Sequence, residues 1–122
     1  MRVLVLEDEP ILQMDLAMML EGRGYRVSTS ETAEGAVEVA RLEQPTVAIL
    51  DLNLGHGRPD GVDAAREIMR VSPSTQIIFQ TAHQDPKSRG RMISVMPVAI
   101  LNKPFDEARL LALVAGAEGV AA

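Results

Sequence analysis

Five short apolar runs alternate with five stretches of helical periodicity, and this alternation limits the fold more than any other feature of the 122-residue chain. Four runs are continuously apolar, as expected of parallel strands that helices cover on both faces. They are residues 3–6, 47–50, 77–79 and 98–101. The run 25–29 alternates with polar residues instead, so we expect it at an edge of the sheet.

Apolar side chains at helical spacing predict one helix after each run. Thr32 and Asp106 are the expected N-caps of the second and fifth helices, and Pro86 suits the first turn of the fourth. Gly116 and Gly119 should fray the end of the fifth. The five apolar stripes are Leu12, Leu16, Met19 and Leu20; Ala33, Ala36, Val37 and Ala40; Val62, Ala65, Ile68 and Met69; Met92, Ile93 and Met96; and Leu110, Leu111 and Val114.

A βα unit repeated five times, with right-handed crossovers and an edge-like second strand, predicts an α/β fold. The expected form is a doubly wound (βα)5 sandwich, flavodoxin-like, with a parallel sheet of order 2-1-3-4-5. The length suits one domain with a core of its own. In such folds function lies outside the carboxyl ends of the strands. The residues that follow or end the apolar runs there are Glu7, Asp8, Asp51, Thr81 and Lys103.

Composition excludes several classes of protein. The chain has no cysteine, which excludes disulfides, thiolate metal sites and a cysteine nucleophile. A net charge of −5 and 2% aromatic residues argue against direct binding to nucleic acid. The apolar run at the N-terminus is too short for a signal peptide or a membrane span, so we expect a cytoplasmic protein without a membrane partner.

In the predicted sheet the first and third strands are neighbours, which places Glu7, Asp8 and Asp51 together. Three carboxylates at one point repel unless they share a proton or bind a hard cation such as Mg²⁺. Their three negative charges and the positive charge of Lys103 sum to −2, which one Mg²⁺ neutralises. A carboxylate can also accept a phosphoryl group when cations stabilise the transferred oxygens. Asp51 follows the central strand and could be this phosphoryl acceptor. Lys103 and the Thr81 hydroxyl would then contact the phosphoryl oxygens.

The same residues carry a family resemblance. Glu7-Asp8, Asp51-Leu52-Asn53, Thr81-Ala82 and Lys103-Pro104-Phe105 resemble the signature of CheY-like response regulator receiver domains in their order and spacing. The resemblance implies one receiver domain over residues 1–119, followed by a short tail at 120–122. It also implies Mg²⁺, or alternatively Mn²⁺, as the cofactor.

The resemblance implies a role for each matched residue. Asp51 is expected to accept the phosphoryl group, and the implied metal ligands are Glu7, directly or through water, Asp8, Asp51 and the backbone carbonyl of Asn53. Thr81 resembles the switch hydroxyl, and Lys103 resembles the lysine that contacts the phosphoryl group, aimed by a cis peptide bond before Pro104. Asn53 and His83 are expected to tune the rate of dephosphorylation.

Two places depart from the family pattern. The family couples its switch hydroxyl to an aromatic ring three residues before the lysine, where this chain has Ile100. We therefore expect the phosphorylation chemistry to survive and the coupling to the output face to differ. The glycine-rich segment 54–61 is longer than a tight turn needs, so we expect a mobile loop.

Two further expectations concern residues outside the motif. Asp15 lies on the apolar stripe of the first helix, too far from Asp8 to join its cluster, so a hydrogen-bonded structural role is expected. The seven methionines, among them Met14, Met18 and Met96, are interpreted as core residues, with a methionine-rich groove for a partner as the alternative.

The resemblance implies a signalling switch and not a turnover enzyme. A sensor histidine kinase or histidine phosphotransferase, or a small phosphodonor, would phosphorylate Asp51, and the altered surface would bind an unknown downstream protein. One alternative is a pseudo-receiver that does not cycle, motivated by Ile100. Another is a haloacid-dehalogenase-like phosphohydrolase, which pairs its nucleophile with an acid two residues later, where this chain has Asn53. A stand-alone regulator, a phosphate sink and a receiver excised from a longer protein remain open.

Overall fold

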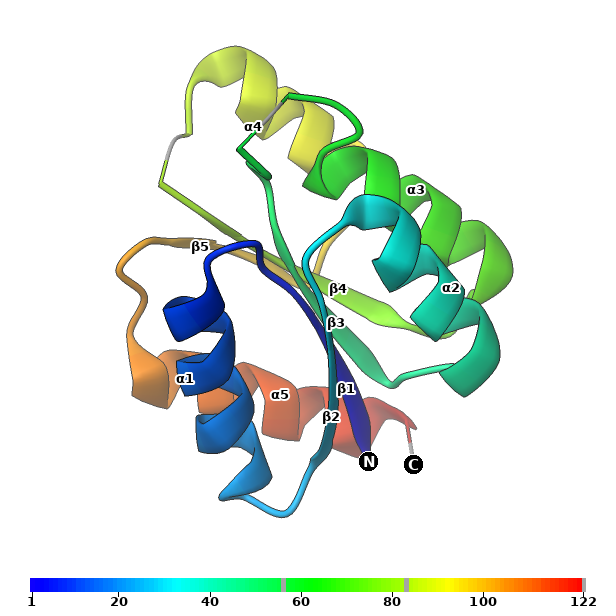
Figure 1. Cartoon of the computed structure of the whole chain (residues 1–122), viewed down its shortest axis with the longest axis vertical. Helices are drawn as coiled ribbons and strands as arrows, with labels where there is room; N and C mark the ends of the chain where they lie inside the picture. Colours follow the sequence, from blue (N-terminus) through cyan, green and yellow to red (C-terminus); the bar gives the residue numbers. More distant parts are fainter. Residues whose placement is uncertain (56, 83, 122) are drawn as a thin grey trace.

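The computed structural model describes residues 1–55, 57–82 and 84–121 as five strands that alternate with five helices (Figure 1). All strand pairs are parallel, and the sheet order is β2-β1-β3-β4-β5, which confirms the predicted topology. The elements are β1 (Arg2–Leu6), α1 (Pro10–Glu21), β2 (Arg26–Ser30), α2 (Ala33–Glu43), β3 (Val47–Asp51), α3 (Gly61–Val71), β4 (Gln76–Thr81), α4 (Pro86–Ile93), β5 (Ala99–Asn102) and α5 (Glu107–Ala121).

Helices cover both faces of the sheet. Helices α1 and α5 lie on one face, and α2, α3 and α4 lie on the other (Figure 1). Successive side chains of a strand point to opposite faces, so β3 contributes Val47 and Ile49 to the core under α1 and α5, and Ala48 and Leu50 to the other core. This double burial explains why the central strands are continuously apolar.

Side-chain caps fix where several helices begin. Thr32 accepts a hydrogen bond from the Gly35 N–H at 3.1 Å, and Asp106 accepts one from the Ala108 N–H at 2.9 Å. Both caps confirm predictions from the sequence. Pro86 begins α4, as expected of a residue that lacks an N–H and suits the first turn.

The ends of the last two helices differ from the prediction. Helix α4 stops at Ile93, and Met96 lies beyond it with φ of 54° and 86% exposure. Pro97 disfavours a helical conformation at the residue before it, and Val95 takes the place in the core. Helix α5 continues through Gly116, because burial of Ala117 against the sheet outweighs the poor helix propensity of glycine.

Helix α1 is apolar on its solvent side as well as on its core side. Leu16 and Leu20 are buried, whereas Ile11, Met14 and Met18 are 72%, 54% and 63% exposed. The expectation that the methionines fill the core is therefore wrong for Met14 and Met18, and also for Met69 and Met96, although Met92 is fully buried. No helix in the described part of the chain is long and apolar enough to cross a membrane.

The segment between β3 and α3 is held near both of its ends, at Leu54 and at Asp60. Leu54 is 1% exposed and belongs to the core. Asp60 caps α3 and accepts two hydrogen bonds from the Arg91 guanidinium of α4, at 2.6 and 3.2 Å. Arg91 thus ties α4 to the segment that follows the site strand β3.

Arg91→Met should lower the free energy of unfolding by about 1–2 kcal/mol, because it leaves the nearly buried Asp60 carboxylate without its charged partner. Arg70→Met is the matched control, since Arg70 pairs with Glu67 on the exposed surface of α3. That control should change stability by less than about 0.5 kcal/mol. Urea denaturation of both variants measures the difference, and equal losses would contradict the anchoring role of Arg91.

Candidate functional site

The carboxyl ends of three strands bring together charged residues that are far apart in the sequence. Glu7 follows β1, Asp51 ends β3, and Lys103 follows β5. The Lys103 Nζ donates hydrogen bonds to Glu7 Oε1 at 2.9 Å and to Asp51 Oδ2 at 3.0 Å. The predicted juxtaposition of the two acids with the lysine is therefore present.

Lys103 is held from its backbone as well as from its ammonium group. Its N–H donates to the Thr81 carbonyl oxygen at 2.8 Å, and the peptide bond between Lys103 and Pro104 is cis, as the resemblance implied. Its side chain is 19% exposed. The ammonium group is thereby directed to the ends of β1 and β3.

Three carboxylates form the acidic cluster of the site. Glu7, Asp8 and Asp51 each offer one oxygen, and these oxygens lie within 4.8 Å of one another. Glu7 is fully buried, Asp51 is 4% exposed, and Asp8 is half-buried. The cluster borders a pocket of about 310 Å³ that is lined by Asp8, Glu9, Asp51, Asn53, Gly55, Ala82 and Lys103.

Two glycines allow the backbone to approach the acids closely. A Cβ at Gly61 would lie 2.2 Å from the Asp51 carbonyl oxygen, so the start of α3 can pass this strand end only as glycine. Gly55 has φ of +78°, and a Cβ there would lie 3.0 Å from Asp8 Oδ2. Gly55 thus lines the acidic pocket, and Gly61 lets α3 begin directly beside the end of β3.

The surroundings raise the pKa of both central titratable groups, for different reasons. Burial, and then the negative charge of Glu7, raise the pKa of Asp51 to about 7, although Lys103 opposes the shift. Burial lowers the pKa of Lys103, but its hydrogen bonds to Glu7 and Asp51 outweigh this effect, so the pKa is raised overall. The lysine is therefore charged at neutral pH, and Asp51 is poised between its two forms.

The donor set fits a hard divalent cation. The three carboxylates and Lys103 carry a net formal charge of −2, and carboxylate oxygens are the ligands that Mg²⁺ prefers. Both oxygens of Glu7 already accept hydrogen bonds, Oε1 from Lys103 and Gln80 and Oε2 from the Glu9 N–H. Asp51 accepts one hydrogen bond at each oxygen, from the Asn53 N–H and from Lys103, so Glu7, with three donors, has the least capacity for direct coordination.

Two further predicted residues, Thr81 and Asn53, lie beside this centre. Thr81 ends β4 and is fully buried, and Asn53 lines the pocket and donates its N–H to Asp51 Oδ1 at 3.3 Å. Ile100 is half-buried on β5 and pairs in register with Phe79. His83 lies outside the described residues.

Sequence reasoning missed Gln80, which shares the Glu7 carboxylate with Lys103. Its Nε2 donates to Glu7 Oε1 at 3.3 Å, and the residue is 1% exposed. The only sequence signal is an amide directly after the apolar run 77–79, and such a residue is also common where a strand ends at the surface. The register that pairs Gln80 with Asp51 identifies its place in the site.

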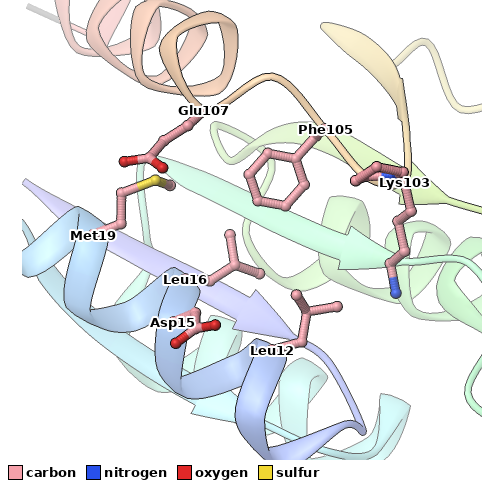
Figure 2. Close-up of a pocket in the computed structure, with 8 residues that line it drawn as sticks. Leu12, Asp15, Leu16, Met19, Lys103, Phe105 and Glu107 are labelled. Carbon is pink, nitrogen blue, oxygen red and sulfur yellow. The ribbon is translucent and has the colours of Figure 1, made fainter.

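A second pocket, of about 390 Å³, lies between α1 and the start of α5 (Figure 2). Lys103 lines both this pocket and the acidic one. Asp15 is exposed at the second pocket, and within the described residues its side chain makes no hydrogen bond, so the expected hydrogen-bonded role is wrong. The lining residues are Leu12, Asp15, Leu16, Met19, Lys103, Pro104, Phe105 and Glu107.

Comparison with known proteins identifies the family. The sequence profile of the response regulator receiver domain matches residues 3–115. The chain belongs to this family. It is a receiver domain of two-component signal transduction, as the motif implied.

Two curated relatives of this receiver show how much of a regulator it spans. The transcriptional regulatory protein PdtaR of Mycobacterium tuberculosis is 39% identical over 114 residues, which cover 90% of this chain and 53% of the relative. The phyllosphere-induced regulator PhyR of Methylorubrum extorquens is 30% identical over 117 residues, which cover 94% of this chain and 42% of the relative. The receiver therefore spans about half the length of these curated relatives.

Solved structures agree with this assignment. The receiver domain of a modulated diguanylate cyclase from Desulfovibrio desulfuricans is 32% identical with a TM-score of 0.86, and the match covers 95% of this chain and 91% of that one. A CheY-like receiver from Methanospirillum hungatei reaches a TM-score of 0.87 at 20% identity, over 94% and 90% of the two chains. At that identity the second match supports the fold alone.

Proposed function

We propose that Asp51 accepts one phosphoryl group from a phosphohistidine of a sensor histidine kinase or histidine phosphotransferase, and that the modified receiver then binds a downstream protein. The observation that carries the proposal is the position of the Lys103 ammonium, 3.0 Å from Asp51 in a cluster of three carboxylates. An acid that is to receive a phosphoryl group needs such a fixed cation for the transferred oxygens. In this proposal the chain acts as a switch and not as a turnover enzyme.

Asp8, Asp51 and the Asn53 carbonyl are the proposed direct ligands of Mg²⁺ or Mn²⁺, with Glu7 acting through water. Bound Mg²⁺ supplies the positive charge that neutralises the cluster and orients the phosphoryl oxygens. It also favours the ionised form of Asp51, whose pKa of about 7 without metal leaves much of it protonated at neutral pH.

The transfer itself uses the residues of the chain. One ionised oxygen of Asp51 attacks phosphorus in line, a new O–P bond forms, and the N–P bond of the phosphohistidine breaks with its electron pair going to the imidazole. Lys103 holds a transferred oxygen, and the Thr81 hydroxyl donates to another. Attack by water on the phosphorus later releases phosphate, at a rate that we expect Asn53 and His83 to tune.

The proposal also covers how phosphorylation of Asp51 changes the surface that binds the downstream protein. Thr81 moves with the phosphoryl group, and Ile100 transmits less of this motion to the α4, β5 and α5 face than an aromatic ring would.

We place the receiver domain at residues 1–119, with a short tail at 120–122. We also propose a cytoplasmic location, where a two-component phosphodonor is available.

The exposed side of α1 is the proposed docking surface for the phosphodonor. Ile11, Met14 and Met18 form an apolar stripe there, beside the pocket that Lys103 lines. A contiguous exposed apolar stripe is typical of a surface that binds a partner protein. A partner seated on α1 reaches the strand ends that carry Asp51.

Met14→Glu combined with Met18→Glu should therefore lower the rate of phosphotransfer from a cognate histidine kinase by at least about 10-fold. The rate with acetyl phosphate should stay unchanged, because this small donor needs no docking surface. Leu42→Glu is the control, since Leu42 is 67% exposed on α2, far from α1. The cognate kinase is taken as the one that phosphorylates the wild type fastest, and its rate of phosphotransfer to each variant measures the effect. An equal loss of rate in the Leu42 variant would contradict the assignment of α1 as the docking surface.

Incubation with acetyl phosphate, with and without Mg²⁺, tests the proposed function by intact mass. A gain of one phosphoryl group that needs Mg²⁺ and is absent in Asp51→Asn is the expected result. No adduct and no consumption of the donor would favour the pseudo-receiver. Turnover of a phosphomonoester in excess over protein would favour the phosphohydrolase.

A further inference from the structure

Gln80 is a buried amide at the centre of the site, and nothing in the receiver motif assigns it a role. It is the penultimate residue of β4, is 1% exposed, and follows three apolar residues of the strand. We propose that Gln80 is a positioning residue: it pins the Glu7 carboxylate so that Lys103 and the Mg²⁺ ligands keep the geometry for phosphoryl transfer. This inference rests on the proposed function and extends it to a residue that touches neither metal nor phosphoryl group.

The contacts of Glu7 define what Gln80 does. Glu7 Oε1 accepts from Lys103 Nζ at 2.9 Å and from Gln80 Nε2 at 3.3 Å, while Oε2 accepts from the Glu9 N–H at 3.2 Å. Donors from three different parts of the fold thus surround a carboxylate that is 0% exposed. Because a buried carboxylate cannot turn to solvent, its orientation depends on these donors alone.

Lys103 cannot serve Glu7 and a phosphoryl group equally well. In the phosphorylated protein the ammonium must turn toward the transferred oxygens, and it then weakens its bond to Glu7. Gln80 is the side-chain donor that remains on the same oxygen of Glu7. Without it, Glu7 draws Lys103 back from Asp51 and loses the fixed orientation needed to hold a water of the metal shell.

The other end of the amide supports this role. Within the described residues, Gln80 Oε1 is buried and has no hydrogen-bond partner. An unpaired buried carbonyl oxygen is unfavourable, and a methionine of similar length avoids the penalty. Rotating the amide places this oxygen against the Glu7 carboxylate, which is worse. The contribution of the amide therefore lies in the bond to Glu7.

Gln80→Met tests the proposal, with Gln76→Met as the matched control. Gln76 lies on the same strand and the same face, and its amide donates to the Ala117 carbonyl oxygen at 3.3 Å, at the opposite end of the strand. Isothermal titration calorimetry with MgCl₂ should show about 10-fold weaker binding to Gln80→Met, and unchanged binding to Gln76→Met. The Mg²⁺ midpoint for labelling by acetyl phosphate should rise by the same factor, without loss of melting temperature.

Wild-type Mg²⁺ affinity in Gln80→Met, or an equal loss in Gln76→Met, would overturn the proposal. Should Gln80→Met fail to fold, Gln80→Leu serves in the same two assays. The double variant with Glu7→Gln adds a further test: Gln80→Met should have no additional effect on Mg²⁺ affinity in that background, and an additive loss contradicts an action through Glu7. The calorimetric arm needs no phosphodonor, so it decides the role of Gln80 even if the wild type takes no phosphoryl group.

Discussion

Lys103→Met should slow the labelling of Asp51 by acetyl phosphate by roughly 100-fold at saturating Mg²⁺. The substitution keeps the aliphatic stem that lines the second pocket and removes only the charge placed 3.0 Å from Asp51. Loss of one fixed donor to a developing anion typically costs about 10²–10³ in rate. Quenched-flow sampling with intact mass measures the rate constant.

Lys87→Met is the control for this variant, because Lys87 is the other lysine of the chain and is exposed on α4. It should label at the wild-type rate. Lys103→Met should also raise the pKa of Asp51 further, since the lysine opposes the existing shift. A normal rate in Lys103→Met would remove the lysine from the proposed chemistry.

Asp51→Asn should abolish labelling and, in the absence of metal, should stabilise the protein above pH 7. The folded state raises the pKa of Asp51 from 3.8 to about 7, so it binds a proton more tightly than the unfolded chain does. Stability therefore falls as the pH rises from about 4 to 7 and stays reduced at higher pH. Asparagine removes this loss, which we place at about 1–2 kcal/mol after allowing for solvent at the open pocket.

Thermal melts in EDTA at pH 4 and pH 8 measure this difference. At pH 8 Asp51→Asn should melt roughly 3–8 °C above the wild type, and at pH 4 the two should nearly coincide. Asp15→Asn is the control, because Asp15 is an exposed carboxylate outside the acidic cluster. A melting difference that is the same at both pH values would contradict the electrostatic origin of the effect.

The fold was largely predictable because strand burial and helix periodicity both follow from the local order of apolar and polar residues. Continuous apolar runs gave the buried strands, and the alternating run gave the edge strand β2. The failures lie where neighbours in space override local preference. Ala117 packs against the sheet and carries α5 past Gly116, while Pro97 ends the conformation that the spacing of Met96 suggested.

The centre of the site was predictable for a different reason: parallel strands bring their carboxyl ends to one edge. That rule places Glu7, Asp51 and Lys103 together once the strand order is known. It does not identify Gln80, whose part in the site depends on the face of β4 to which its side chain points. Nor does it identify the pair of Asp60 with Arg91, two residues 31 positions apart in the sequence that connect the start of α3 to α4.

Chemical mapping of the phosphoryl group tests the central claim most directly. The protein is labelled with acetyl phosphate and Mg²⁺ and then reduced with borohydride, which converts an acyl phosphate of aspartate to homoserine. Peptide sequencing by mass spectrometry should find homoserine at position 51, with Asp8 unmodified. Homoserine at another acid, or none in protein that has consumed the donor, would contradict the assignment of Asp51 as the phosphoacceptor.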